Sequence, residues 1–191
     1  LDATHRPHVT LVQRFVRTAE LEQAYAALER VFASVDLAHL KLEAFKNYYI
    51  PEGDIGLAGI VAKPTPALIQ LQQDVIDALA PFTVASGASS AFVTTPDDLV
   101  MNPALIEYVR AFVPKASGDH FSPHVSTGVA SREFLDHMLE EPFESFEFGL
   151  IGAAVYQLGQ FGTAAKKLKS LRVSAGRAEE ARARSERRRA G

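Results

Sequence analysis

Hydrophobic and polar positions in the first half of the chain follow two different periods. The run at residues 8–15 (HVTLVQRF) has the β-rich composition of a strand and comes directly after a proline. Apolar side chains from Leu21 to Phe32, and again from Leu68 to Leu79, recur at the spacing of a helix. The pattern therefore predicts strands over residues 8–15, 40–50 and 55–62, and helices over residues 18–35 and 66–80.

The second half shows the same two kinds of segment. Pro103 stands in the first turn of one apolar-periodic segment, and Ser131 precedes another as a cap. Residues 161–173 fit either a helix or a final edge strand, because their alanines and lysines favour a helix while Gly159 and Gly162 indicate a turn. The expected elements are strands over 91–95, 123–129, 145–151 and 153–160, helices over 102–112 and 131–141, and a polar loop over 115–121.

One short motif occurs once in each half. Residues 7–10 read PHVT and residues 123–126 read PHVS, and each is followed by a predicted helix and then two strands. The repeat predicts an α+β fold of two related lobes, over about 1–85 and 86–175. The second copy has a further strand and helix before its motif, so the first lobe lacks its opening strand and helix. Since the chain opens on leucine, either a leader was removed or the sequence starts inside a longer protein.

Composition narrows the class of protein. The chain has 191 residues, enough for one compact domain, and its lack of cysteine excludes disulfides, thiol nucleophiles and cysteine metal sites. No apolar run approaches the 18 or so residues of a membrane helix. The net charge is −3, yet the tail at 176–191 holds six arginines and three glutamates, so the body carries −6. The body therefore has no basic excess for nucleic acid, and the tail is expected to be disordered or a solvated helix.

The repeated motif brings a specific set of chemical groups. Side chains two apart on a strand share a face, so His8 lies with Thr10 and His124 with Ser126. If two such strands lie together, one imidazole can deprotonate an attacking water while the other protonates a leaving oxygen, and the hydroxyls can hold phosphate oxygens. This set fits in-line attack on a phosphodiester and needs no metal. The alternative is structural: each histidine caps a strand or satisfies a buried carbonyl.

The motifs HVTL at 8–11 and FSPHVS at 121–126 resemble those of the two-histidine (2H) phosphoesterase superfamily, which includes 2'-5' RNA ligase-like proteins and cyclic nucleotide phosphodiesterases. The resemblance covers most of residues 1–173. It implies a bilobal fold with a pseudo-twofold axis, duplicated β-α-β units and antiparallel sheets lining a central cleft. It further implies metal-independent hydrolysis or ligation of 2',3'-cyclic or 2',5'-linked phosphates, with His8 and His124 catalytic and Thr10 and Ser126 binding phosphate. Family members normally carry a strand and helix before the first motif.

Further expectations concern aromatic side chains, partners and compartment. Tyr48 and Tyr49 at a strand end, together with Tyr156 and Phe161, are candidates for stacking on a base, although core packing is the more common use of such side chains. We expect no metal and no cofactor. The expected partner is a nucleotide or an RNA-terminal phosphate, with no membrane partner and a monomeric chain. The compartment stays open between the cytoplasm and, if a signal was removed, export to the periplasm.

Three alternatives to this phosphodiesterase remain open. The first is a nucleotide- or RNA-binding module of the same fold that performs no chemistry. The second is a structural or interaction protein that does not respond to phosphate. The third is a ribonuclease, because the same pair of histidines can cleave the RNA chain itself. The identity of the acid and of the base among the two histidines also stays open.

Overall fold

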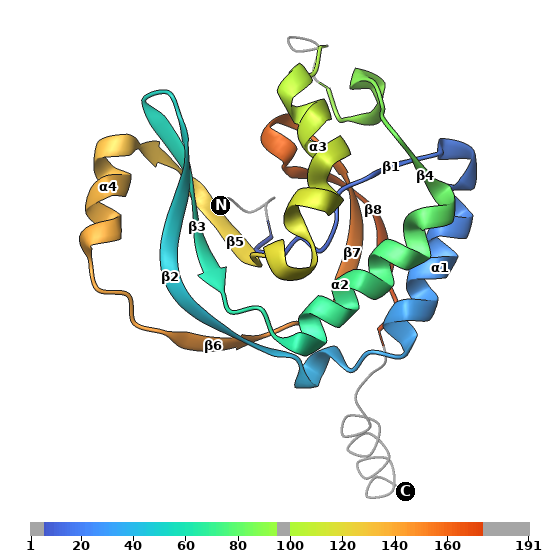
Figure 1. Cartoon of the computed structure of the whole chain (residues 1–191), viewed down its shortest axis with the longest axis horizontal. Helices are drawn as coiled ribbons and strands as arrows, with labels where there is room; N and C mark the ends of the chain where they lie inside the picture. Colours follow the sequence, from blue (N-terminus) through green and yellow to red (C-terminus); the bar gives the residue numbers. More distant parts are fainter. Residues whose placement is uncertain (1–5, 95–99, 174–191) are drawn as a thin grey trace, which may run out of the picture.

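The computed structural model describes residues 6–94 and 100–173 of the chain. Within these residues the fold is mixed α+β, with four α-helices and three antiparallel sheets (Figure 1). The helices are α1 (Leu21–Ala33), α2 (Pro66–Leu79), α3 (Pro103–Ala116) and α4 (Arg132–Glu140). The strands are β1 (Phe15–Val16), β2 (Lys41–Glu52), β3 (Ile55–Ala62), β4 (Thr83–Val84), β5 (His124–Ser131), β6 (Phe146–Gly149), β7 (Ala153–Leu158) and β8 (Ala164–Leu171).

The largest sheet is curled and has the strand order β5-β3-β2-β6. Its longest strand, β2, has 12 residues and is interrupted by a bulge between Ala44 and Lys46, which lets the sheet bend. Helix α4 covers the outer face of the curve, and α3 lies on the inner side (Figure 1). A side chain at Gly56 would lie 2.7 Å from Leu135 of α4, so the glycine permits this close packing. The inner face is left for the candidate site.

The main hydrophobic core lies where α1 and α2 pack together and against β8. Helix α2 begins at a capped turn, in which the Thr65 hydroxyl accepts a hydrogen bond from the Leu68 amide at 3.2 Å and Pro66 fills the first position. Both helices present an apolar stripe to the core, as their sequence spacing predicted. The buried side chains of this core include Leu28, Phe32, Leu42, Leu68, Leu71, Val75, Phe121 and Leu171.

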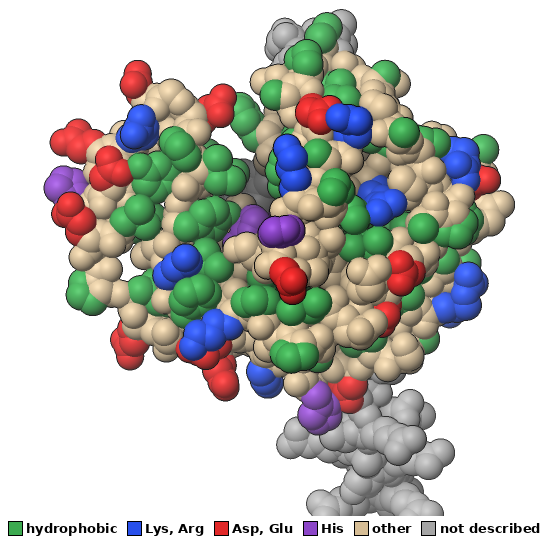
Figure 2. All heavy atoms as spheres, viewed as in Figure 1, with side chains coloured by type: hydrophobic (Ala, Val, Ile, Leu, Met, Phe, Trp, Pro, Cys, Tyr) green, Lys and Arg blue, Asp and Glu red, His purple; other side chains and the backbone are tan. Residues whose placement is uncertain are grey.

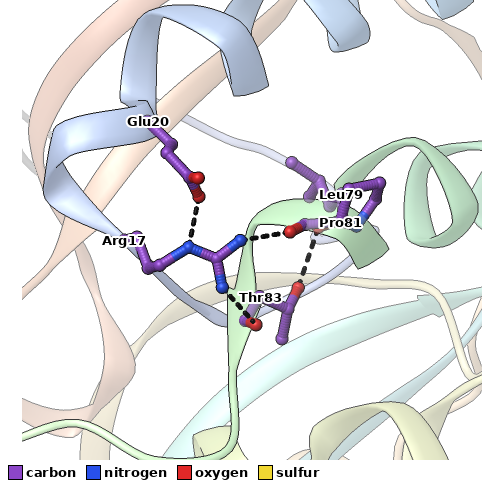
Figure 3. Close-up of polar contacts among 5 residues, drawn as sticks. All are labelled: Arg17, Glu20, Leu79, Pro81 and Thr83. Carbon is purple, nitrogen blue, oxygen red and sulfur yellow. Dashed lines mark hydrogen bonds and ion pairs between the residues drawn. The ribbon is translucent and has the colours of Figure 1, made fainter.

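A short two-stranded ladder of β1 and β4 fastens the first described residues to the end of α2. The Arg17 guanidinium donates hydrogen bonds to the Glu20 carboxylate and to the backbone carbonyls of Pro81 and Thr83 (Figure 3). Next to this ladder, the rings of Phe15 and Phe92 meet edge to face at 5.8 Å in a second hydrophobic cluster. Residues 6–14 are therefore held firmly at their C-terminal end.

Two predicted strands are wrong. Over residues 8–15 only Phe15 joins a ladder, and residues 6–14 make no hydrogen bond between backbone groups within the described chain. Their composition suits a strand, but no strand of the described ranges lies along them to complete a ladder. Over residues 91–95, Ser89–Ala91 form a 3-10 turn and Phe92 is buried against Phe15 instead of entering a sheet. Thr95 lies outside the described residues.

The other predicted elements are confirmed, with shifts of a few residues at their ends. Helix α3 continues to Ala116, into the predicted loop, and the open question over residues 161–173 is answered by strand β8, which pairs with β7. The α+β class is confirmed. The charged tail at 176–191 lies outside the described residues. None of the helices in the described ranges has the length and apolar character required to cross a lipid bilayer.

Candidate functional site

The second histidine motif lies at the start of β5, on the inner face of the curled sheet. Strand register places Ser126 opposite Gly59 of β3, and Gly59 opposite Tyr48 of β2. Residues paired directly across antiparallel strands share a face. Tyr48, Gly59 and Ser126 therefore form one row across three strands, and His124 lies on the same face two residues before Ser126.

Gly59 allows the Tyr48 ring to reach across β3 toward the motif. A Cβ atom at this position would lie 2.4 Å from Cε1 of Tyr48 and 2.9 Å from the carbonyl oxygen of Val125. Real Cβ atoms do not come this close, so the phenol ring can lie over residue 59 because glycine has no side chain. The ring meets that of His124 edge to face, with the centroids 5.1 Å apart and the planes at 68°. Tyr48 thus packs against one side of the His124 imidazole.

The Tyr48 hydroxyl is an unusual group for this position. It is buried and has no hydrogen-bond partner of good geometry among the described residues. Burial raises the pKa of Tyr48 to about 12, against the opposing effect of the nearby Ser126 hydroxyl, and Tyr108 of α3 adds to the rise. The phenol therefore keeps its proton at any physiological pH and can donate a hydrogen bond to an acceptor bound beside Ser126 and His124.

The two motif histidines make the same local contact. Nδ1 of His8 lies 2.9 Å from the carbonyl oxygen of Arg6, and Nδ1 of His124 lies 2.8 Å from that of Ser122. A carbonyl oxygen only accepts, so in each neutral ring Nδ1 carries the proton and Nε2 keeps its lone pair. Both rings are thus oriented with Nε2 as the available base.

The first motif lies at a large cavity between residues 6–14, α1, α2 and β7. This cavity has a volume of about 1010 Å³, and His8, Thr10 and Tyr156 are among its lining residues. Val125, between His124 and Ser126, also lines it, so the two motif segments meet at this hollow. His124 and Ser126 lie on the Tyr48 side of β5 and do not line the cavity. No ring contact or hydrogen bond joins His8 to His124 within the described chain.

A buried glutamine connects the segments that lead to both motifs. Gln72 of α2 is 0% exposed, and its Nε2 donates hydrogen bonds to the carbonyl oxygens of Leu11 and Ala116, each at 2.9 Å. Its Oε1 accepts from the Gly118 amide at 3.3 Å. Leu11 follows Thr10 directly, and Gly118 lies on the turn that leads to β5. One side chain therefore fixes the backbone on both sides of the candidate site.

The remaining predicted residues are placed apart from His124. Tyr49 lies on the opposite face of β2, where its hydroxyl donates to Asp136 of α4. Phe161 is 74% exposed and adopts a positive φ of 57° in the turn between β7 and β8. Among the aromatic candidates for base stacking, Tyr156 alone lines the cavity beside His8.

Gly59 and Gln72 were missed by the sequence reasoning, which also did not distinguish Tyr48 from Tyr49. Tyr48 and Tyr49 are adjacent, and only the strand register shows that Tyr48 shares the face of His124. Gly59 and Gln72 carried a weaker signal: a glycine inside a strand indicates close approach of another group, and a glutamine at an apolar helical position needs buried partners. Neither pattern identifies the residue that contacts the glycine or the groups that bond to the glutamine.

A metal site would need several histidine or carboxylate side chains close together. Within residues 6–94 and 100–173, no three histidine, aspartate or glutamate side chains come together as a metal-ligand set.

Comparison of the sequence with protein-family models and with curated proteins gives no match. The function therefore has to be argued from the residues themselves.

Proposed function

We propose that the protein is a phosphodiesterase of the two-histidine type, which hydrolyses a 2',3'-cyclic or 2',5'-linked nucleotide phosphate by acid-base catalysis without a metal. The observation that carries the proposal is the matched state of the two imidazoles. His8 and His124 each give Nδ1 to the carbonyl two residues earlier and leave Nε2 for chemistry. The shared Pro-His sequence gives both rings this local contact, and the proposal adds that the two free Nε2 atoms act on one phosphate. One chain carries both, so a monomer is sufficient.

The proposed reaction is a single in-line displacement at phosphorus. Nε2 of one neutral histidine takes a proton from the attacking water, whose oxygen forms the new bond to phosphorus. The bond to the leaving ribose oxygen breaks, and the second histidine, protonated at the start, gives its proton to that oxygen. In this proposal the bound phosphate bridges the two rings, so the mechanism does not require them to touch. Which histidine acts as base depends on the direction in which the substrate binds.

Hydroxyl donors near each ring suit the charge of a phosphodiester. Thr10 and Ser126 hold the non-bridging oxygens in this proposal, and the protonated Tyr48 phenol is a third donor on the Ser126 side. Neutral donors stabilise the anion without fixing a metal. Tyr156, which lines the cavity with His8, is the aromatic side chain available to the rest of the substrate.

We further propose that the fold is the bilobal, duplicated one of the same superfamily. The second motif begins a strand, β5, and is followed by α4, β6 and β7; the first motif is followed by α1, β2 and β3. This equal order of elements after each motif supports the duplication. The two halves differ at the motif itself: the second motif begins strand β5, whereas residues 8–14 at the first motif form no ladder within the described chain.

Hydrolysis of the four 2',3'-cyclic nucleoside monophosphates in the presence of EDTA tests the proposal. We expect turnover in the intact protein, a bell-shaped dependence of kcat/KM on pH, and a loss of about 10²- to 10⁴-fold in His8→Ala and His124→Ala. His137→Ala is the matched control, because His137 is 73% exposed on α4, where it pairs with Glu140. If both motif variants hydrolyse the substrate as fast as the control, the mechanism is wrong.

A nucleotide-binding module without chemistry is the second candidate. It is favoured by the absence of a close His8 to His124 contact in the described residues, which a binding site does not require. Isothermal titration with uridine 2'-monophosphate separates the two: saturable binding without hydrolysis of any cyclic nucleotide supports the module and contradicts the enzyme.

A further inference from the structure

A small pocket lies between α3 and the short β1–β4 ladder. Its volume is about 330 Å³, within the range of small-molecule sites, and its walls are mainly apolar, with Phe15, Val109 and Val113 among the lining residues. None of the four motif residues lines it. On the face drawn in Figure 2, lysine and arginine side chains gather over α3 and on its side toward β4. The pocket therefore combines apolar walls with positive charge.

Two arginines, Arg14 and Arg110, are the charged residues of the lining, and no aspartate or glutamate is among the described residues that form it. Nε and Nη2 of Arg110 donate to both carboxylate oxygens of Glu107, at 2.6 and 2.7 Å. Arg14 is half-buried and donates from Nη1 to the Thr83 hydroxyl at 3.3 Å, but it has no carboxylate partner in the described chain. Arg14 thus carries the unbalanced positive charge of the pocket.

The free edge of the Arg14 guanidinium indicates what it binds. Nε and Nη2 form the edge with which Arg110 holds a carboxylate through two parallel hydrogen bonds, and in Arg14 this edge has no acceptor among the described residues. A guanidinium taken partly out of water is normally paired with an anion. Since Glu107 already balances Arg110, one negative charge completes the pocket. The apolar walls require that the anion also carries an apolar group.

We propose that this pocket binds a small monocarboxylate with an apolar body. Its carboxylate pairs with the free edge of Arg14, and its body lies against Phe15, Val109 and Val113. Inorganic phosphate matches the guanidinium but leaves the apolar walls uncovered. A neutral apolar molecule covers the walls but leaves Arg14 without a counter-ion. The proposal does not depend on the phosphodiesterase activity.

Amide NMR of the full 191-residue protein, titrated with phenylacetate, tests the pocket. We expect saturable one-to-one binding with a Kd of about 1 mM or lower, and shifts concentrated at residues 83–85 and 109–113. The ligand controls are acetate, which lacks the apolar body, and 2-phenylethanol, which lacks the charge. Inorganic phosphate tests charge alone. We expect each of the three to bind about tenfold more weakly than phenylacetate, or less.

Two pairs of protein variants make the outcome specific. Arg14→Gln removes the charge and is expected to weaken phenylacetate binding by about tenfold or more, whereas Arg30→Gln, at an exposed position of α1 outside the lining, leaves it unchanged. Ala85→Phe fills the pocket from an exposed wall position and keeps both arginines, so it is expected to weaken binding to a similar extent. Ala88→Phe, which is exposed and outside the lining, is its control.

The Ala85→Phe comparison decides the result if Arg14→Gln does not fold. Three outcomes would overturn the proposal. The first is no saturable binding of phenylacetate to the intact protein, and the second is equal binding of 2-phenylethanol or phosphate. The third is binding that stays at the level of the control variants in folded Arg14→Gln or in Ala85→Phe.

Discussion

Replacement of Gln72 by leucine tests the idea that one buried side chain supports both halves of the candidate site. The change keeps the side-chain volume close to the original but removes two 2.9 Å hydrogen bonds to the carbonyls of Leu11 and Ala116 and one 3.3 Å bond from the Gly118 amide. An unsatisfied buried backbone group costs about 1–3 kcal/mol, and leucine recovers part of this by apolar burial. We therefore expect Gln72→Leu to lower the free energy of unfolding by about 2–4 kcal/mol, a large share of the ~5–15 kcal/mol typical of a domain.

Urea unfolding followed by circular dichroism measures this loss, and kcat for a cyclic nucleotide measures its effect on the site. Gln73→Leu is the matched control, because Gln73 is the next residue of the same helix and makes an exposed hydrogen bond to Asp77. That exposed pair is worth about 0.2–0.5 kcal/mol. If the free energies of unfolding of Gln72→Leu and Gln73→Leu differ by less than this, Gln72 does not hold the two segments.

Two further predictions concern the inner face of the sheet. Gly59→Ala is expected to cost about 1–3 kcal/mol and to displace the Tyr48 ring, because the new Cβ would lie 2.4 Å from that ring; Gly128→Ala, with nothing within 4 Å of its Cβ, serves as the control, and equal melting temperatures would refute the crowding. The free energy of unfolding of Tyr48→Phe at pH 7 should lie within about 0.5 kcal/mol of the wild-type value, since the hydroxyl lacks a hydrogen-bond partner within the described chain. Because the pKa of Tyr48 is raised to about 12, the unfolded state loses its proton first, so wild-type stability falls between about pH 10 and 12 by more than that of Tyr48→Phe; parallel pH curves would contradict this.

The elements that could be predicted are those whose signals are local. Strand β3 matches its predicted residues 55–62, and the turn before it contains Gly53 at a φ of +58°, a conformation that favours glycine. Helix α2 could be predicted from its apolar stripe and its flanking prolines. In each case the neighbours that decide the structure lie within a few residues in the sequence.

The parts that failed depend on distant residues. Residues 8–14 have the composition of a strand, but a strand also needs a partner, and no local pattern reports whether one is present. The choice between Tyr48 and Tyr49 depends on the register with β3 and β5. The partners of Gln72 lie 61 and 44 residues away along the chain. Pairing and register are properties of the assembled fold, so composition and periodicity could not supply them.

The central claim is that one phosphate is held by both motif histidines, and imidazole NMR tests it most directly. The protein is titrated with uridine 2'-monophosphate while the ring signals of His8 and His124 are followed, with the exposed His39 and His137 as internal references. We predict that both motif rings shift with the same dissociation constant and that the reference rings do not move. A shift of only one motif ring, or of neither, would contradict the shared site.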